Sequence, residues 1–88
     1  MNLVYTGRFK RDFKRVIKRN RDENKLWEII NKLLKGESLP AKCEDHPLGG
    51  KWKGRRDCHI EPDWILIYFV RGDDLILERT GSYSDLFR

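Results

Sequence analysis

The sequence is poor in cysteine and contains no long apolar run, and these two absences exclude several classes of protein. Its only cysteines, Cys43 and Cys58, form no CxxC pair, so neither a disulfide framework nor a redox motif is indicated and a reducing compartment fits best. The longest apolar run, Trp64 to Val70, is far shorter than the ~20 residues that a membrane-spanning helix needs. The N-terminal stretch lacks the apolar core of a signal peptide. We therefore expect a cytoplasmic protein with no contact with a membrane.

Negative charges are outnumbered by positive ones. The chain has 19 lysines and arginines against 14 aspartates and glutamates, which gives a net charge of +5 and a pI near 9.4. This balance favours a polyanionic partner such as nucleic acid, although a solvated basic surface explains the charge equally well. With 88 residues, 39% of them hydrophobic, the chain can build one compact core and is too short for two. We predict a single domain over residues 1–88.

The first half of the chain shows the apolar period of two helices. Residues 2–5 suggest a short strand, and Thr6 can cap the helix that follows. The buried stripe of this helix is predicted to consist of Phe9, Phe13, Val16 and Ile17. Its outer faces carry cations that could contact phosphate or could simply be solvated, namely Arg8, Lys10, Arg11, Lys14, Arg15, Lys18 and Arg19.

A second helix is expected after Asn20. Asp22 is its predicted cap, and Gly36 with Pro40 should stop it. Its apolar positions repeat the same pattern at Leu26, Ile29, Ile30, Leu33 and Leu34. Two amphipathic helices joined by a short polar turn form an antiparallel hairpin, and their apolar faces need a sheet to cover them.

The second half is predicted to form that sheet. The expected strands are residues 51–55, 57–61, 63–70 and 74–80, with a hairpin turn at Gly72-Asp73. The run WILIYFV is apolar at every position, which is typical of a central strand that is covered on both faces. Residues 83–88 should form a short terminal helix or an extended tail. This order of elements predicts an α+β fold.

Both histidines lie in the second half of the chain, where the strands are predicted, so candidate acid–base residues are sought there. Cleaving RNA without a metal requires a base for the 2'-hydroxyl, an acid for the leaving 5'-oxygen and a cation for the phosphorane. Histidine suits both proton transfers because its ordinary pKa, about 6.5, is close to working pH. Strand alternation puts Asp57, His59 and Glu61 on one face and Cys58 with Ile60 on the core side. His46 lies in a loop rich in Pro and Gly, and a purely structural role for either histidine remains the alternative.

Three further readings concern residues near this segment. Arg79, at the end of the run LILERT, could clamp a phosphate or could form a surface salt bridge. Phe87, Trp52 or Tyr83 could stack on an RNA base, whereas Trp64 opens the apolar strand and belongs to the core.

A zinc site is disfavoured because adjacent strand residues face opposite ways and the usual paired spacing is absent. Its four candidate ligands would be Cys43, His46, Cys58 and His59.

The segment DHPLGGKWKGRRDCHIEPDWILIY, followed by LERTGSYSDLF, resembles the YafQ branch of the RelE/ParE toxin superfamily. The similarity extends in order over nearly the whole chain. It implies a RelE-like fold, in which an N-terminal two-helix hairpin packs on a twisted, mostly antiparallel four-stranded sheet, with a short C-terminal helix or tail. It also implies a ribosome-dependent endoribonuclease that cleaves messenger RNA through the 2'-hydroxyl without a metal or other cofactor.

The resemblance assigns functional positions to this chain. It implies that His46, His59 and Asp63 share proton transfer, that Arg79 stabilises the phosphorane and that Phe87 supports the scissile base. In the family pattern a histidine follows ERTGS or ERTGT, whereas this chain has Tyr83 there. A tyrosine, with an ordinary pKa of about 10, is a poorer proton shuttle at neutral pH. The residues expected to bind RNA are Lys51, Lys53, Arg55, Arg56 and Phe87.

The resemblance also implies partners. An antitoxin encoded beside the toxin would wrap it with a C-terminal segment and cover its basic catalytic face, and the complex would bind operator DNA through the antitoxin. Two alternatives stay open: a non-enzymatic ParE-like toxin that binds a protein such as DNA gyrase, and an RNA-binding module that does not cut. The acid–base set of His46, His59 and Asp63 argues against the first. Cleavage ending in a 2',3'-cyclic phosphate or a 3'-phosphate would exclude the second.

Overall fold

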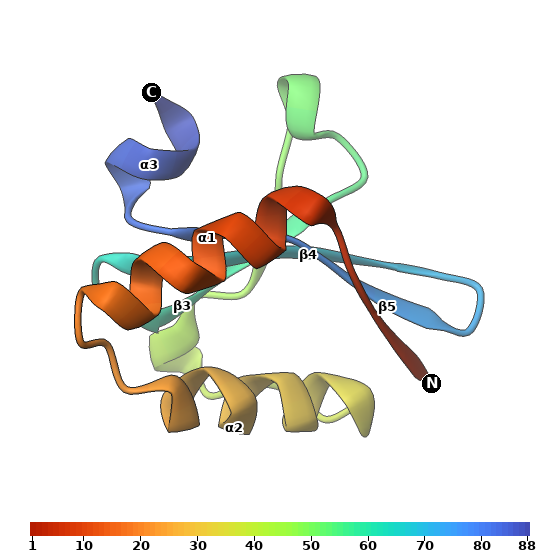
Figure 1. Cartoon of the computed structure of the whole chain (residues 1–88). Coiled ribbons are helices and arrows are strands. Elements are labelled where there is room, and N and C mark those ends of the chain that lie inside the picture. Colours follow the sequence, from red (N-terminus) through yellow and green to blue (C-terminus); the bar gives the residue numbers. More distant parts are fainter.

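The computed structural model describes residues 1–88 and contains one five-stranded sheet with helices on both of its sides (Figure 1). The strands are β1 Asn2–Tyr5, β2 His46–Pro47, β3 Arg56–Glu61, β4 Trp64–Arg71 and β5 Asp74–Gly81. The helices are α1 Gly7–Lys18, α2 Glu23–Leu34 and α3 Tyr83–Phe87, with single 3-10 turns η1 Ala41–Cys43 and η2 Gly50–Trp52. The strand order is β1-β5-β4-β3-β2, and only the pair β1–β5 is parallel. The predicted α+β fold with a mostly antiparallel sheet is confirmed.

The short strand predicted at residues 2–5 is confirmed as β1, and because it joins the sheet the strand count is five and not four. The strand predicted at residues 51–55 is wrong. Residues 51–55 form most of η2 and a turn, since Gly50 before them and Gly54 within them adopt positive φ angles of 60° and 89° that interrupt a strand. The edge of the sheet is formed instead by the two residues of β2, and β1 adds the fifth strand at the other edge. None of the helices combines the length and the apolar composition that a membrane-spanning helix needs.

The predicted caps of both N-terminal helices are confirmed. The Thr6 side chain accepts a hydrogen bond from Phe9 N at 3.0 Å, and the Asp22 side chain accepts one from Asn24 N at 3.0 Å. Asn20 lies in the turn between the two helices and has a φ of 59°, a conformation that asparagine adopts more readily than most residues. α1 and α2 run in opposite directions, as the hairpin prediction requires (Figure 1).

Two apolar clusters hold the sheet. The larger lies on the helical side and combines α1 and α2 with inward residues of β3, β4 and β5; its fully buried members include Leu26, Ile30, Cys58, Leu66, Leu75 and Leu77. The smaller lies on the opposite side, where Ile65 and Ile67 contact Leu86 of α3. Trp64 is 1% exposed, so its predicted place in the core is confirmed and β4 is covered on both faces.

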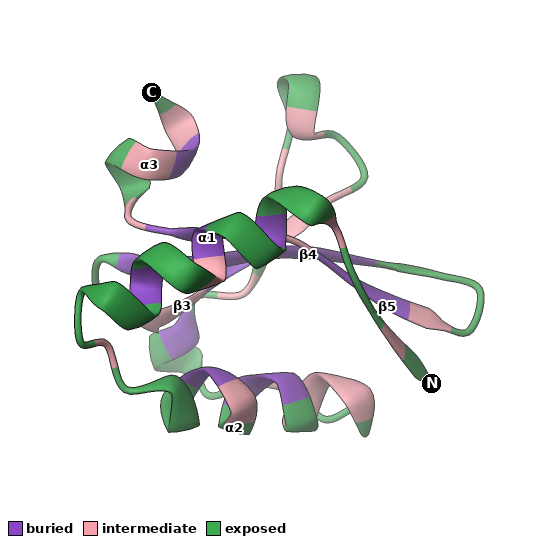
Figure 2. Cartoon of the chain, viewed as in Figure 1, coloured by how far each residue is buried: buried purple, intermediate pink, exposed green.

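One position of the predicted helical stripe is wrong. Ile17 is 39% exposed, because it stands about 100° round the helix from its neighbour Val16, which is buried. The purple inward side and green outward side of α1 are visible in Figure 2. α2 lies below the sheet in this view, whereas α3 and the loop that contains η2 rise above it. The side of the sheet away from α2 is therefore the more thinly covered one, and it carries the candidate site.

Candidate active site

A row of cross-strand partners places three of the polar side chains on one face of the sheet. His46 of β2 pairs with Asp57 of β3, Asp57 pairs with Ile67 of β4, and Ile67 pairs with Arg79 of β5. Directly opposed residues of antiparallel strands project from the same face. Because neighbouring strands are about 4.8 Å apart, the two ends of the row are roughly 14 Å apart. Ile67 belongs to the smaller apolar cluster, so the row faces away from α2.

A β-bulge brings Arg79 into this row. Tyr68 pairs with Leu77, but the next residue of β4, Ile67, pairs with Arg79, so that Glu78 is the additional residue. Without the bulge, strict alternation would oppose Ile67 to Glu78 and direct Arg79 to the helical side. Because of the bulge, Arg79 projects from the face that carries His46 and Asp57, next to Glu78.

His46 is held by one carbonyl and one carboxylate. Its Nδ1 lies 2.6 Å from Glu44 O and 3.1 Å from Asp57 Oδ1. A carbonyl can only accept, so Nδ1 carries the hydrogen and Nε2 is left unprotonated in the neutral ring. The hydrogen bond goes to the closer carbonyl, because Asp57 Oδ1 makes no hydrogen bond of good geometry despite the short approach. The His46 side chain is half exposed, which leaves Nε2 open to a substrate.

Asp57 is a site residue that the sequence analysis placed correctly on the strand but gave no role. It is only 4% exposed. Burial raises the pKa of the Asp57 carboxyl, while the nearby His46 and His59 oppose that rise. The carboxylate makes no hydrogen bond to either ring, so its influence on the two histidines is electrostatic. The signal in the sequence was the alternation that put Asp57 on the face of His59.

His59 lies two residues further along β3, opposite Ile65. Its Nδ1 is 3.1 Å from Pro62 O, so this ring also donates from Nδ1 and presents Nε2 as a base. Beyond Asp57, β2 no longer covers β3, and His59 opens into a cleft of about 390 Å³ at that edge. Two lysines and two glutamates line the cleft, and one of these lysines, Lys25, is paired with Glu61 at 2.8 Å. The two histidines therefore lie on the same face, and only His59 lines a cleft.

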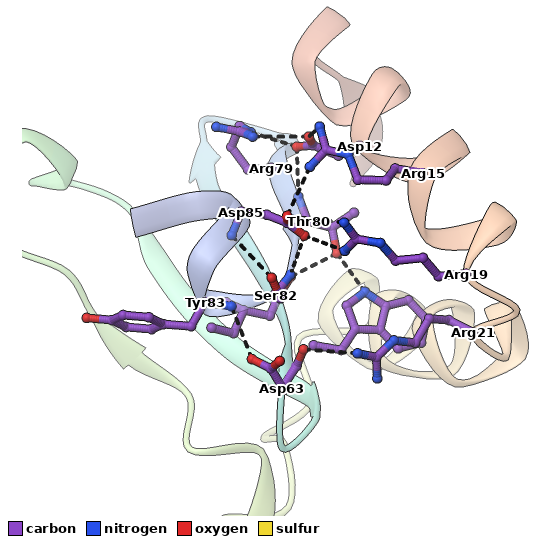
Figure 3. A network of polar contacts seen from close by, with 12 residues as sticks. Asp12, Arg15, Arg19, Arg21, Asp63, Arg79, Thr80, Ser82, Tyr83 and Asp85 are labelled. Atoms are coloured by element: carbon purple, nitrogen blue, oxygen red, sulfur yellow. Dashed lines mark hydrogen bonds and ion pairs between the residues drawn. The ribbon is translucent and has the colours of Figure 1, made fainter. Parts of the chain in front are cut away.

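Asp63 anchors α3 to the turn between β3 and β4. Its Oδ1 accepts a hydrogen bond from Tyr83 N at 3.2 Å, and its backbone carbonyl accepts one from Arg21 at 3.3 Å (Figure 3). The start of α3 is fixed further by a capping box between Ser82 and Asp85. The predicted proton-transfer residue thus has a structural contact as well, and it sets where Tyr83 stands.

Arg79 is clamped by a residue that the sequence analysis did not single out. Its Nε and Nη2 donate to the two oxygens of Asp12 at 2.6 Å and 3.1 Å, and Thr80 N donates to the same carboxylate at 3.2 Å (Figure 3). Asp12 is 2% exposed and raises the pKa of Arg79 above its usual value. Two of the five guanidinium N–H groups are used, which leaves three for a phosphate. Salt bridge and phosphate clamp are therefore compatible.

The candidate stacking residues form an aromatic ridge over the smaller cluster. The Phe87 ring lies 5.0 Å from that of Tyr83 and 6.1 Å from that of Trp52, in an edge contact. Phe87 is half-buried against the cluster of Ile65, Ile67 and Leu86. Tyr83 is 60% exposed, and its ring points away from Asp12 and Arg79 (Figure 3). The hydroxyl of Tyr83 is thus accessible but not in contact with Arg79.

The expected RNA-binding cations divide into two kinds. Lys51 and Lys53 are exposed and form no ion pair, whereas Arg55 binds Glu78 at 2.7 Å and Arg56 binds Asp45 at 3.2 Å. Glu78 and Arg55 line a hollow of about 320 Å³ together with Arg8, Lys51 and Trp52. This hollow contains three cations for one carboxylate, so its lining carries a net positive charge.

The four residues weighed as zinc ligands are not gathered into a centre. No group of three or more His, Cys, Asp or Glu residues is arranged to hold a metal ion. Cys43 and Cys58 are buried and form no disulfide, and burial raises the pKa of the Cys58 thiol. The donors available on the open face are therefore imidazole, carboxylate and guanidinium groups.

A two-helix layer on one side of the sheet and a histidine, carboxylate and arginine face on the other define a small toxin of the RelE-like class. Comparison with known proteins agrees, and it narrows the class. The chain belongs to the family described as "Bacterial toxin of type II toxin-antitoxin system, YafQ", which it matches over residues 1–88.

Relatives of known identity cover almost the full chain. It is 46% identical over 87 residues to the mRNA interferase toxin YafQ of Escherichia coli K12, which corresponds to 98% of this chain and 95% of that protein. The YafQ chain in the crystal structure of the E. coli DinJ–YafQ complex superimposes with a TM-score of 0.91 at 45% identity, covering 99% and 98% of the two chains. A copper-bound mutant toxin from Helicobacter pylori gives a TM-score of 0.95 at 44% identity, with 99% of each chain covered.

Proposed function

We propose that this chain, as one toxin domain over residues 1–88, is a ribosome-dependent endoribonuclease that cleaves messenger RNA and thereby inhibits translation. The observation that carries the proposal is the row of His46, Asp57 and Arg79 on one face, with His59 beside it. It is supported by the name mRNA interferase that the 46% identical relative carries. The chain acts in the cytoplasm, where ribosomes and messenger RNA are found.

The chemistry needs only groups that this face presents. A histidine Nε2 removes the proton of the 2'-hydroxyl, and the 2'-oxygen forms a bond to the adjacent phosphorus. Arg79 stabilises the additional negative charge of the phosphorane with its three uncommitted N–H groups. The bond from phosphorus to the 5'-oxygen then breaks, and an acid donates a proton to that oxygen. The products are a 2',3'-cyclic phosphate and a 5'-hydroxyl, and no metal takes part.

His46, His59, Asp63 and Tyr83 share the proton transfers, and the buried Asp57 carboxylate, 3.1 Å from His46 Nδ1, stabilises the imidazolium that forms when His46 takes a proton. The aromatic ridge that ends in Phe87 supports the scissile base. The RNA strand and the ribosomal RNA are held by Lys51, Lys53, Arg55 and Arg56, with the basic hollow around Lys51 as the main phosphate contact.

The physiological partner is a cognate antitoxin that covers the catalytic face and keeps the toxin inactive. The DinJ–YafQ complex supports this proposal, because its YafQ chain has the same fold at 45% identity. Binding to operator DNA occurs only through the toxin–antitoxin complex. The net charge of +5 suits an acidic inhibitor that competes with RNA for the same positive surface.

The test is primer extension on a defined messenger RNA with purified ribosomes, comparing wild type with His59→Ala and Arg79→Lys. We expect codon-phased cuts with wild type and their loss in both variants, with Asp73→Ala as an exposed control that cleaves normally. Magnesium is kept for the ribosome, and a chelator selective for zinc and copper should leave cleavage unchanged. Arrested growth on expression without any cuts would transfer the assignment to a toxin that binds a protein target.

A further inference from the structure

An apolar groove opens between α1, α2 and the end of β1, on the helical side of the sheet. It encloses about 330 Å³, and four of its lining residues are aromatic: Tyr5, Phe9, Phe13 and Trp27. Their rings form a continuous row, with centroid distances of 5.6 Å from Tyr5 to Phe9 and 6.1 Å from Phe9 to Phe13. The last step, from Phe13 to Trp27, is an edge contact at 6.1 Å. No part of the ribonuclease mechanism uses this groove.

The groove exists because the two helices pack against different strands. α1 packs mainly on β5 and α2 on β3, so they do not close over the rings between them. Phe13, expected on a buried stripe, is only half-buried, and Tyr5 is 38% exposed. Phe9, at 2% exposed, forms the floor of the groove, and the uncovered parts of Tyr5, Phe13 and Trp27 adjoin around it. In a chain with 38% charged residues and a mean hydropathy of −0.74, adjoining apolar surface of this kind is a feature of interaction sites.

The charge around the groove has one sign. Lys10 and Lys14 complete its lining, one helical turn apart on α1, and no carboxylate lines it. Both lysines are exposed, and neither takes part in an ion pair within the chain. An occupant must therefore supply apolar side chains for the rings and negative charge for the two ammonium groups.

We propose that this groove is a docking site for the cognate antitoxin, which inserts an aromatic or long aliphatic side chain flanked by Asp or Glu residues. The inference rests on the proposed function in that the partner is the antitoxin of the ribonuclease toxin. It assigns a second attachment point on the side of the sheet opposite the catalytic row. An antitoxin segment seated here holds the toxin without competing with RNA, while another segment covers the site.

Two other occupants fit the groove less well. An RNA base needs hydrogen-bonding partners for its edges, and the lining offers only the Tyr5 hydroxyl and two ammonium groups around closely packed rings. RNA cut at the row of His46 and Arg79 would also have to pass round the edge of the sheet. A second copy of this chain would bring a second Lys10 and Lys14 to the same groove, and like charges oppose that pairing.

The experiment measures the affinity of the purified full-length antitoxin for the full-length toxin, beside ribosome-dependent cleavage by the free toxin. Lys10→Glu/Lys14→Glu should weaken binding by about tenfold or more at low salt, with a smaller effect at high salt. Phe13→Ala should weaken it by roughly 30-fold, as expected for a buried aromatic contact at an interface. The surface double variant keeps the test valid if Phe13→Ala proves poorly folded.

The matched control is Lys35→Glu/Arg71→Glu, which changes the net charge equally at two exposed positions outside the groove. Its affinity should stay within about threefold of wild type. Unchanged antitoxin binding in the groove variants overturns the proposal, as does impaired cleavage with normal antitoxin binding, which would indicate RNA. A toxin dimer that the groove variants dissociate would identify a second copy instead. If the wild-type toxin does not cleave messenger RNA but the groove variants weaken antitoxin binding, the proposed ribonuclease function is rejected and the proposed docking site stands.

Discussion

Replacing Asp12 with alanine should destabilise the protein strongly and disable Arg79. The carboxylate is 2% exposed, it accepts two hydrogen bonds from Arg79, and it accepts a third from Thr80 N. β1 ends at Tyr5, so Asp12 takes the place of a strand at this part of the β5 edge. Asp12→Ala would leave a guanidinium that is only 11% exposed without its counter-ion, and a buried N–H without an acceptor.

Breaking a buried pair by removing one partner costs about 3–5 kcal/mol. For a domain of this size, each kcal/mol lowers Tm by about 4–8 °C, so Asp12→Ala should lower it by about 12 °C or more. Urea unfolding monitored by circular dichroism measures the free energy. Asp12→Asn keeps an acceptor for Thr80 N and should lose less stability, while cleavage should still fall because Arg79 is no longer held by a charge.

The matched control is Asp73→Ala, whose carboxylate is 83% exposed and should change stability by no more than about 0.5 kcal/mol. In a double-mutant cycle, Asp12→Ala with Arg79→Ala should cost less than the sum of the single changes, since neither leaves a partner behind. A loss below about 1 kcal/mol for Asp12→Ala, or full additivity in the cycle, would refute the reasoning.

Three further predictions concern α3 and the residues that it positions. Gly81→Ala should lower stability by about 1–3 kcal/mol and weaken cleavage, because a Cβ there would lie 2.9 Å from Asp85 Oδ2 at a φ of 155°; an unchanged Tm would contradict this. Arg19 holds the pKa of Asp85 well below its usual range, so Asp85 stabilises the fold above about pH 4 and this contribution is lost as pH falls further. Urea unfolding from pH 7 to pH 2 should therefore show a flatter acid limb for Asp85→Asn than for wild type. Tyr83→His should raise the single-turnover cleavage rate near pH 7, because imidazole, with an ordinary pKa of about 6.5, exchanges protons at that pH more readily than a phenol with one of about 10. Tyr83→Phe, which has no proton to transfer, should lower the rate. Equal rates for both variants would remove Tyr83 from proton transfer.

Local signals in the sequence were sufficient for the elements that form the scaffold. The uninterrupted apolar run that begins at Trp64 predicted a strand covered on both faces, and the caps Thr6 and Asp22 follow from side chains that bond to an amide two or three residues away. Alternation along β3 separated the buried Cys58 from His59 on the open face. Each of these inferences depends on neighbours close in sequence, which a single sequence displays.

What could not be predicted depends on contacts between distant segments. Asp12 stands among cations on α1, and only the fold brings it to Arg79, 67 positions away. The bulge at Glu78 has no signature in LILERTG, yet it decides which side Arg79 faces. The strand wrongly predicted at residues 51–55 has a local cause. Its alternating lysines and tryptophan resemble the pattern of a strand, but Gly50 and Gly54 adopt positive φ angles that produce turns.

The most direct test of the account uses ribosomes carrying a messenger RNA in which one nucleotide, at the mapped cut, lacks its 2'-hydroxyl. Cleavage by a histidine–arginine face through the 2'-oxygen predicts that this single change abolishes the cut. It also predicts that the unmodified message yields a 2',3'-cyclic phosphate and a 5'-hydroxyl. Continued cleavage of the deoxy-substituted message, leaving a 5'-phosphate, would mean that water is the nucleophile and would contradict the roles given to His46, His59 and Arg79.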